Sequence, residues 1–489
     1  MKRESFGSRL GFILVSAGCA IGIGNVWKFP YICGAYGGAA FILIYLLFLI
    51  ILGIPVLVCE FAVGRGSRKS VALSFDELQS KNGKWTPLKF IGIIGCYMLM
   101  MFYTTVGGWL MYYCYKGIRG SFVNASSDNI STQFSQMLTD VPTMLFWTIL
   151  ICVIGFAVCM FGLNNGIERV TKVMMTALIL IMVVLAIRSV TMTGAGEGIR
   201  FYLIPDFHKM VESGIGNVVF AALSQAFFTL SIGIGAMLIF GSYLDQSRSL
   251  TGEAVNIMLL DTFVALTAGF IIIPACFSYG IEPGAGPSLI FITLPNIFAQ
   301  MSGGRIWAFL FFLFLTFAAL STIIAVFENL VMFNMELLGW RRKKSVLVCA
   351  TLIIILSIPC VLGFNVWSGV QLLGEGSTIM DLEDFIVSNN LLPLGSLGYV
   401  LFCTRKNGWG WDAFIKEVNT GSGMKFPKTL RGYVSYGIPA IIIVIYLKGY
   451  YDKFKDMGIG IFVGWMIFAI VFLAWVIYCA TSVEKDRTE

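Results

Sequence analysis

The stretch Gly18-Cys-Ala-Ile-Gly22-Ile-Gly24-Asn25 interrupts an apolar run that covers residues 10–36. A second apolar run, 215–240, is interrupted by Thr229-Leu-Ser231-Ile-Gly233-Ile-Gly235. Either motif alone would be explained by close helix packing, because glycine lets two helices approach each other. Each of these two runs is, however, the first in a block of five apolar runs. Glycine-interrupted spans at matching places in two halves are typical of inverted-repeat transporters with a midplane binding site.

The composition requires a lipid environment. The chain has 489 residues, of which 57% are hydrophobic and only 12% charged, whereas soluble domains carry roughly 25% charged residues. A membrane-spanning helix needs about 20 mostly apolar residues. The segments that qualify are 10–36, 40–63, 89–118, 143–162, 167–188, 215–240, 252–277, 305–336, 345–363, 380–403, 433–449 and 459–480.

We therefore expect an all-α membrane protein with 12 transmembrane helices in a single transporter domain, residues 1–489. Its first inverted repeat would cover 9–190 (spans 1–5) and its second 214–404 (spans 6–10), each beginning with an unwound helix. Two accessory helices would follow within 430–481. The net charge is +7, and the basic residues lie mostly in loops on one side of the membrane, as in the run Arg341–Lys344. This placement indicates the orientation of the protein in the membrane and not nucleic-acid binding. Both termini are expected in the cytoplasm, in a multi-pass protein of the cell membrane.

The chemistry of the two interruptions favours a cation and an amino acid as ligands. An unwound helix exposes N–H groups that suit a carboxylate and carbonyls that suit Na⁺. Asn25, Thr229 and Ser231 add oxygen donors. The first interruption contains no Asp or Glu, which argues for a zwitterion that brings its own carboxylate.

Three carboxylates lie inside apolar spans, where buried charge is costly and often functional. For Glu60 and Glu328 a structural role is at least as plausible as a functional one. For Asp261, whose flanking residues offer no hydrogen-bond donor, we favour function.

Other classes of protein fit the sequence less well. An enzyme would need a nucleophile–base pair or a metal cluster, and the one histidine, His208, lies in a polar loop. The twelve cysteines fall mostly in apolar runs without metal-ligand spacing and are expected to be small buried residues. A channel would show rings of donors around a pore. A receptor that binds but does not translocate remains an open alternative.

At the two interruptions and at several other motifs, the chain resembles the neurotransmitter:sodium symporter family, and most closely its bacterial amino-acid transporters. The likeness covers nearly the whole length. The runs that carry it are Ala20-Ile-Gly-Ile-Gly-Asn25-Val-Trp-Lys-Phe-Pro30, Gly53-Ile-Pro55, Gly166-Ile-Glu-Arg169, Ser224-Gln-Ala-Phe-Phe-Thr-Leu-Ser231, Phe291-Ile-Thr-Leu-Pro295 and Phe317-Ala-Ala-Leu-Ser-Thr322.

The resemblance implies sodium-coupled symport of neutral hydrophobic, including aromatic, L-amino acids across the bilayer, with two Na⁺ sites. One site would use Gly18, Ile21, Ala318, Ser321 and Thr322. The other would use Ala20, Asn25, Thr229, Asp261 and the substrate carboxylate. The substrate would contact Ala20, Gly22, Ile23, Gly24, Leu99, Tyr103, Val106, Phe228, Thr229, Ser231, Ile234, Thr322 and Val326.

The resemblance also implies two gates. The outer gate would pair Lys28 with Asp384, and the inner gate would pair Arg3 with Glu336, aided by Tyr243. Lys28 stands where arginine is frequent and lacks its bidentate fork. Thr176 replaces a common proline of span five, and Ile234 replaces a common aromatic residue.

No chloride requirement is expected. Chloride-dependent relatives hold an anion with a tyrosine, a glutamine and small hydroxyl residues. Tyr45 and Gln225 match the first two, but Ala265 stands where a hydroxyl or a glutamate is expected. Asp261 occupies a position that is asparagine in those relatives. A fixed carboxylate there would supply the negative charge that chloride otherwise brings.

Overall fold

The computed structural model describes residues 4–81, 83–281 and 288–482. In these ranges the chain is helical and has no β-strand, and an isolated bridge joins Arg248 and Ser422. Ten helices are long and apolar enough to cross a membrane. They cover Ala39–Ser67, Thr86–Arg119, Val141–Met160, Leu163–Val190, Leu250–Ser278, Gly304–Leu337, Arg342–Leu362, Ile379–Thr404, Lys428–Phe454 and Ile459–Thr481.

The first and sixth predicted spans are broken, as their glycines predict. The helix Arg9–Ala20 and the segment Gly24–Ala35 meet at an angle of 57°, and counting this pair as one span gives up to 11. The predicted span 215–240 is divided into Ile215–Thr229, with 15 residues, and Ala236–Tyr243, with 8. Each part alone is too short to cross a bilayer. The count of twelve and the inverted-repeat organisation therefore stay predictions.

The helices fall into two groups. Those that build the spans are α1 (Arg9–Ala20), α2 (Phe29–Ala35), α3 (Ala39–Phe48), α4 (Ile54–Ser67), α6 (Lys89–Arg119), α8 (Val141–Met160), α9 (Arg169–Val190), α12 (Ile215–Thr229), α13 (Ala236–Tyr243), α14 (Leu250–Ser278), α16 (Gly304–Leu337), α17 (Arg342–Leu362), α18 (Ile379–Ile386), α19 (Leu392–Thr404), α21 (Ile438–Phe454) and α22 (Ile459–Thr481). The shorter connecting helices are α5 (Val71–Leu78), α7 (Ser127–Thr139), α10 (Ala195–Leu203), α11 (Phe207–Glu212), α15 (Leu294–Gln300) and α20 (Trp411–Val418).

Single turns of π-helix occur within several spans. They are η1 (Gly24–Lys28), η2 (Leu49–Gly53), η4 (Leu163–Glu168), η5 (Leu289–Thr293), η6 (Val387–Leu391) and η8 (Tyr433–Gly437). Five of them are followed at once by a helix with proline in its first turn, namely α2, α4, α15, α19 and α21. A proline has no N–H to donate to the preceding turn, which helps to explain the locally widened helix there.

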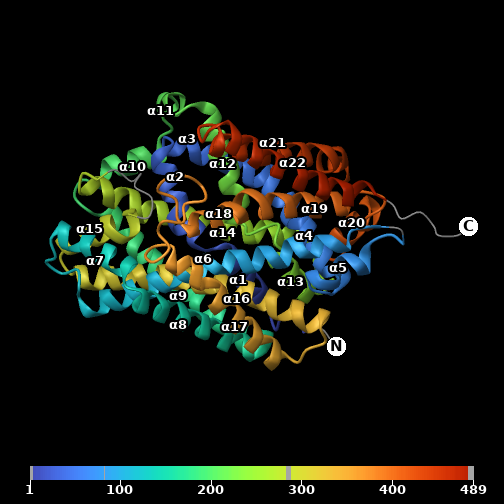
Figure 1. Cartoon of the computed structure of the whole chain (residues 1–489), viewed down its shortest axis with the longest axis horizontal. Coiled ribbons are helices and arrows are strands. Elements are labelled where there is room, and N and C mark those ends of the chain that lie inside the picture. The colour runs from blue at the N-terminus through green and yellow to red at the C-terminus, as the bar shows by residue number, and fades with distance from the viewer. Residues whose placement is uncertain (1–3, 82, 282–287, 483–489) are drawn as a thin grey trace, which may run out of the picture.

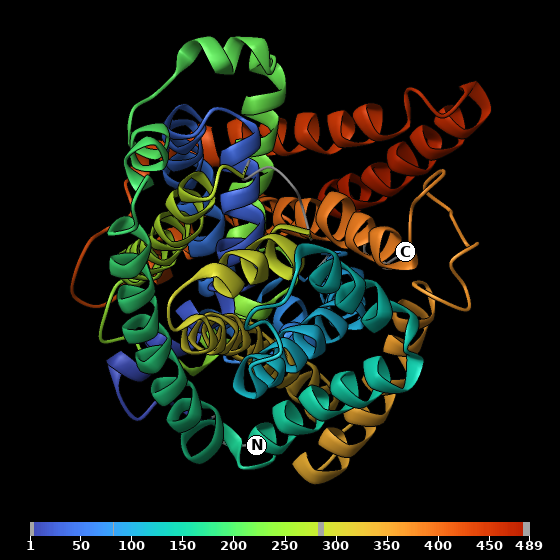
Figure 2. The same cartoon turned by 90° about the vertical axis from the view of Figure 1, so that its left-hand side faces the viewer.

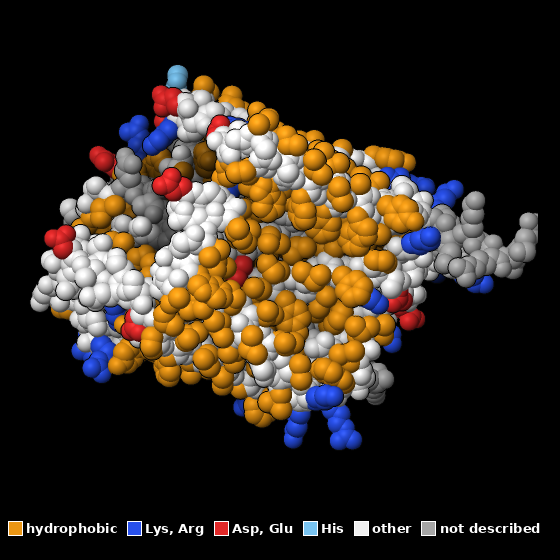
Figure 3. Space-filling view, in the orientation of Figure 1, with side chains coloured by type: hydrophobic (Ala, Val, Ile, Leu, Met, Phe, Trp, Pro, Cys, Tyr) orange, Lys and Arg blue, Asp and Glu red, His pale blue; other side chains and the backbone are white. Residues whose placement is uncertain are grey.

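The arrangement of the molecule matches a membrane bundle. Described residues near both ends of the chain lie toward one end of the long axis, and α7, α10 and α15 lie toward the other (Figure 1). Viewed from that second end, α21 and α22 extend along the outside of the bundle (Figure 2). Hydrophobic side chains form a broad band across the middle of the visible face, whereas charged side chains gather at its ends and lower edge (Figure 3).

The two broken spans are surrounded by the most buried helices. α16 is buried along most of its length, and it packs against α1, α6 and α8. α13 lies in close contact with α4, because a Cβ atom on Gly64 would collide with the carbonyl of Leu238 and one on Gly241 would lie 2.6 Å from the carbonyl oxygen of Phe61. All twelve cysteines are buried and free, as predicted.

Candidate functional site

The break in span one frees backbone groups at the centre of the bundle. α1 ends at Ala20, and Ile21 is extended with φ −69° and ψ 94°. The Gly22 N–H donates to the side-chain oxygen of Asn25 at 3.2 Å. A Cβ on Gly22 would collide with the Tyr103 hydroxyl. Glycine is therefore required here because a side chain approaches the bare backbone.

The break in span six has a left-handed backbone. Ser231, Gly233 and Gly235 have φ values of +51°, +102° and +78°. Such a value is unusual for a serine and indicates strain that the surrounding structure must compensate. The Ser231 hydroxyl donates to the Cys19 carbonyl at 3.2 Å, so the two breaks are in direct contact.

Glu60 holds the second half of span six. Its buried carboxylate accepts N–H donors from Gly233 at 2.9 Å, Met237 at 3.1 Å and Leu238 at 3.4 Å. The last two are unpaired donors in the first turn of α13, whose helix dipole also favours a negative charge. These contacts therefore favour a structural role for Glu60.

A small central cavity of about 20 Å³ lies between the two breaks. Most residues predicted to contact the substrate line it, together with Leu392, which the sequence did not suggest. The lining residues are Ala20, Gly22, Gly24, Leu99, Tyr103, Phe228, Ser231, Ile234, Thr322 and Leu392.

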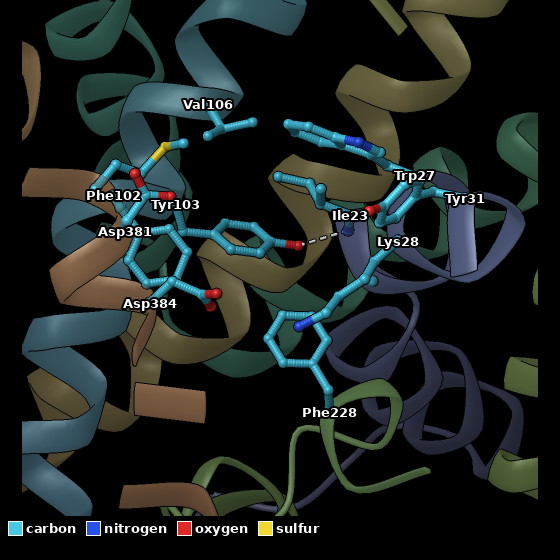
Figure 4. Close-up of a pocket in the computed structure, with 12 residues that line it drawn as sticks. Ile23, Trp27, Lys28, Tyr31, Phe102, Tyr103, Val106, Phe228, Asp381 and Asp384 are labelled. Carbon is cyan, nitrogen blue, oxygen red and sulfur yellow. Dashed lines mark hydrogen bonds between the residues drawn. The ribbon is translucent and has the colours of Figure 1, made fainter. Parts of the chain in front are cut away.

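A second cavity of about 320 Å³ shares Gly24, Tyr103 and Phe228 with the central one. Phe228 therefore lines both cavities, and the Lys28 amino group lies 4.1 Å from the centre of its ring (Figure 4). The Ile23 N–H donates to the Tyr103 hydroxyl at 2.9 Å. We call this larger space the outer cavity. The helix α18, which carries Asp381 and Asp384, forms one of its walls.

Four residues predicted to contact the substrate do not line the central cavity. Ile23 and Val106 line the outer cavity instead. Val326 is fully buried within α16 and is absent from the lining of both cavities. Thr229 is turned toward Asp261, to which its hydroxyl donates at 2.9 Å.

The residues predicted for the gates are only partly brought together. Lys28 and Asp384 line the same outer cavity (Figure 4), but the described part of the chain has no ion pair between them. Asp384 accepts the Ser388 hydroxyl at 2.7 Å. The outer gate thus stays a prediction.

At the inner gate, Arg3 lies outside the described residues. Glu336 accepts the N–H and the hydroxyl of Ser70, both at 2.7 Å. Tyr243 donates to Glu328 at 2.8 Å. Glu328 also receives two donors from Arg342, at 2.8 and 2.9 Å, which makes it part of a buried ion pair.

The first oxygen cluster contains Asn25, Thr229 and Asp261. The Asn25 amide donates to one Asp261 carboxylate oxygen at 2.8 Å and to the Thr229 hydroxyl at 2.9 Å. All three side chains are almost fully buried. Asp261 thus has hydrogen-bond donors, which come from spans one and six and not from its flanking residues. The role of Asp261 as a cation ligand stays a prediction.

The second oxygen cluster surrounds the Thr322 hydroxyl. The carbonyl oxygens of Gly18 and Cys19 lie 3.3 Å away, and those of Ile21 and Ala318 lie 3.4 Å away. Ser321 donates to Ala318 at 3.0 Å. A hydroxyl has one proton to donate, so it cannot satisfy four acceptors. The cluster therefore has the oxygen-rich composition that a hard cation prefers.

Span five is continuous at the substituted proline position. Thr176 lies within α9 and donates its hydroxyl to the Lys172 carbonyl at 2.8 Å. The described residues contain no group of three or more His, Cys, Asp and Glu side chains that could hold a metal ion. The oxygen atoms gathered in the two clusters belong to carbonyls, hydroxyls, one side-chain amide and one carboxylate.

Comparison with known proteins identifies a matching family. The model of the sodium:neurotransmitter symporter family matches residues 3–139 and 128–483. The sodium-dependent transporter YhdH of Bacillus subtilis is 35% identical over 449 residues, which cover 91% of this chain and 98% of that protein. The serotonin transporter of Drosophila melanogaster is 29% identical over 499 residues, covering 91% of this chain and 76% of that one.

A solved structure shows the same fold. The structure of MhsT in complex with L-phenylalanine matches with a TM-score of 0.82 at 35% identity, over 92% of this chain and 100% of that one. The family resemblance inferred from the sequence motifs is thus confirmed. The chain belongs to the sodium:neurotransmitter symporter family.

Proposed function

We propose that this protein is a sodium-coupled symporter that imports neutral hydrophobic L-amino acids, aromatic ones included, by alternating access. One observation carries the proposal. The two oxygen clusters flank the central cavity, and the break in span one contributes to both, through Gly18 and Ile21 on one side and Asn25 on the other. A cation in either cluster would thus fix the same unwound segment that forms the substrate cavity, which couples ion binding to substrate binding.

The lining of the central cavity supports the substrate class. Its side chains are apolar except for the hydroxyls of Tyr103, Ser231 and Thr322, and none is charged. A charged substrate side chain would be buried there without a partner, at a prohibitive cost. Ile234 leaves more room than an aromatic residue would, although Leu392 occupies part of the same wall. The structural relative crystallised with L-phenylalanine is consistent with a large apolar substrate.

The geometry near Asp261 supports independence from chloride. Asp261 lies beside Thr229 and Asn25, so its carboxylate can supply negative charge directly to the first cluster. Ala265, one turn further along α14, is fully buried and has no side-chain group that could hold an anion. We propose two Na⁺ sites at the two clusters and no requirement for chloride.

The orientation follows from charge. Lys and Arg predominate in the loops that we assign to the inner side, including Arg341–Lys344, and cytoplasmic loops carry such an excess. We propose that both termini lie in the cytoplasm, and that α7, α10 and α15 face the exterior. The band of hydrophobic side chains in Figure 3 would then lie in the bilayer of the cell membrane.

Uptake should depend on a sodium gradient. In proteoliposomes, an inward sodium gradient is expected to drive accumulation of leucine, phenylalanine or tryptophan, because each charge moved is worth about 2.3 kcal/mol per 100 mV of membrane potential. The measurement is uptake of radiolabelled amino acid with sodium, and with potassium or choline in its place. Equal uptake in all three would contradict the proposal. Sodium-dependent binding without accumulation would instead favour a receptor that does not translocate its ligand.

Tyr103→Phe should weaken substrate binding without changing the shape of the cavity. The hydroxyl lies beside Gly22 and Ile23, where the substrate carboxylate is expected. Losing a hydrogen bond to a charged group costs about 1.5–3 kcal/mol. Calorimetric titration with sodium present would measure the loss, and Tyr97→Phe on the same helix is the matched control. Unchanged affinity in Tyr103→Phe would show that the carboxylate binds elsewhere.

A further inference from the structure

Glu383 on α18 is a buried carboxyl group without a hydrogen-bond partner. Its relative exposure is 2%, and neither carboxyl oxygen has a partner. It directly precedes Asp384, whose side chain lines the outer cavity, but Glu383 itself does not line that cavity. The two adjacent acidic residues therefore lie in opposite environments, one toward water and one inside the protein.

Glu383 differs from every other buried carboxyl group of the described chain. Each of those has a donor or a cation on at least one oxygen. The partners are backbone N–H groups for Glu60, Lys172 and Ser8 for Glu168, Arg9 for Glu253, Asn25 and Thr229 for Asp261, and Arg342 and Tyr243 for Glu328.

The helices packed against α18 offer no compensating charge. The titratable group that faces Glu383 from α17 is the Cys360 thiol, which is fully buried and only a weak donor. From α6, the Thr105 hydroxyl lies beside that thiol, but it already donates to the Met101 carbonyl at 3.3 Å. An ionised carboxylate at this place would be a buried charge without a counter-ion, which is far more costly than a neutral acid.

We propose that Glu383 is a proton-binding site: its carboxyl group holds a proton while it is packed against α6 and α17, and it releases the proton to water when α18 moves away. No other reactant is needed, since only one O–H bond forms or breaks. The proton stabilises the position of the helix that carries Asp384. Low pH therefore favours the packing seen in this structure, and high pH favours displacement of α18. This inference does not depend on sodium coupling or on the identity of the substrate.

Infrared difference spectroscopy tests the protonation directly. The spectrum of the wild type minus that of Glu383→Gln, both at neutral pH, should contain a carbonyl band of a protonated carboxylic acid that shifts in heavy water. Glu375→Gln removes an exposed carboxylate from the approach to the same helix, and its difference spectrum should contain the bands of an ionised carboxylate instead. Ionised-carboxylate bands in the Glu383 difference spectrum would overturn the proposal.

Thermal unfolding at several pH values gives an independent readout. Free glutamate ionises near pH ~4.3, so above that pH the unfolded chain releases a proton that folded Glu383 holds. Stability falls with pH wherever the folded state binds more protons. The melting temperature of the wild type should thus fall by at least ~2 °C relative to Glu383→Gln as the pH rises to about 9. Parallel pH profiles of the two proteins would refute the assignment. If Glu383→Gln does not fold, Glu383→Leu, which also lacks the charge, replaces it in both tests.

Discussion

Asp261→Asn should reduce sodium-dependent uptake by about 100-fold or more, equivalent to about 2.7 kcal/mol. The carboxylate is the one formal charge in the first oxygen cluster, where Asn25 and Thr229 hold it in place. At an effective dielectric of about 20, a cation about 4 Å from a carboxylate gains about 4 kcal/mol. Asparagine keeps the shape and one oxygen but removes this energy. Uptake into proteoliposomes, with gluconate in place of chloride, measures the effect.

A second substitution distinguishes lost charge from lost structure. Adding Ala265→Ser to Asp261→Asn places a hydroxyl one helical turn further along α14. Tyr45 and Gln225 are buried, and each has a side-chain oxygen without a partner that could take part in an anion site after rearrangement. The double variant should recover part of the uptake only when chloride is present. Full uptake by Asp261→Asn alone in gluconate, or loss of wild-type uptake in gluconate, would contradict the role of Asp261.

Thr322→Val should raise the sodium concentration needed for half-maximal substrate binding by at least about tenfold, or about 1.4 kcal/mol. Valine has the shape of threonine but removes the hydroxyl at the centre of the second cluster. The carbonyls of Gly18, Ile21 and Ala318 would remain without the oxygen that completes the cluster. Titration of sodium against substrate-dependent thermal stabilisation measures the shift.

Thr322→Ser is the matched control for this substitution. Serine keeps the hydroxyl and removes only a methyl group, so the sodium dependence should stay close to that of the wild type. A purely structural role would lower the melting temperature of Thr322→Val in the absence of sodium and leave its sodium dependence unchanged. That result would exclude Thr322 as a cation ligand.

The sequence predicted the parts of the site that depend on local pattern. Glycines at Gly22 and Gly233 are visible in the sequence, and both spans are broken there. The family motifs also selected Asn25, Thr229 and Thr322, which the structure places in the two oxygen clusters. The breaks follow from local pattern because an interrupted helix must expose its backbone wherever it occurs, whereas the ligand roles of Asn25, Thr229 and Thr322 stay predictions.

The remaining features depend on contacts between distant segments. The donors to Asp261 lie 32 and 236 residues away in the chain. α16 is buried on nearly all sides, so its sequence does not distinguish the side that faces the cavity from the others. For that reason the absence of Val326 from the cavity lining could not be predicted. Leu392 reaches the cavity only because α19 begins there, after a turn of π-helix. The short helices α10 and α11 lie in polar loop sequence, which has no extended pattern of apolar residues from which a helix could be predicted.

The contacts between α4 and α13 determine which parts of the protein can move independently. Glu60 on α4 accepts the N–H groups of Met237 and Leu238 in the first turn of α13, and the two helices touch through Gly64 and Gly241. Tilting α13 alone would break these charge-assisted hydrogen bonds inside the bilayer, where no water could replace them. α4 and α13 should therefore turn together as one lever. Because Glu60 also binds the Gly233 N–H, the hinge of that lever would lie before Gly233, at Ser231 and Ile232. The substrate would then lie against the pivot of the movement that releases it.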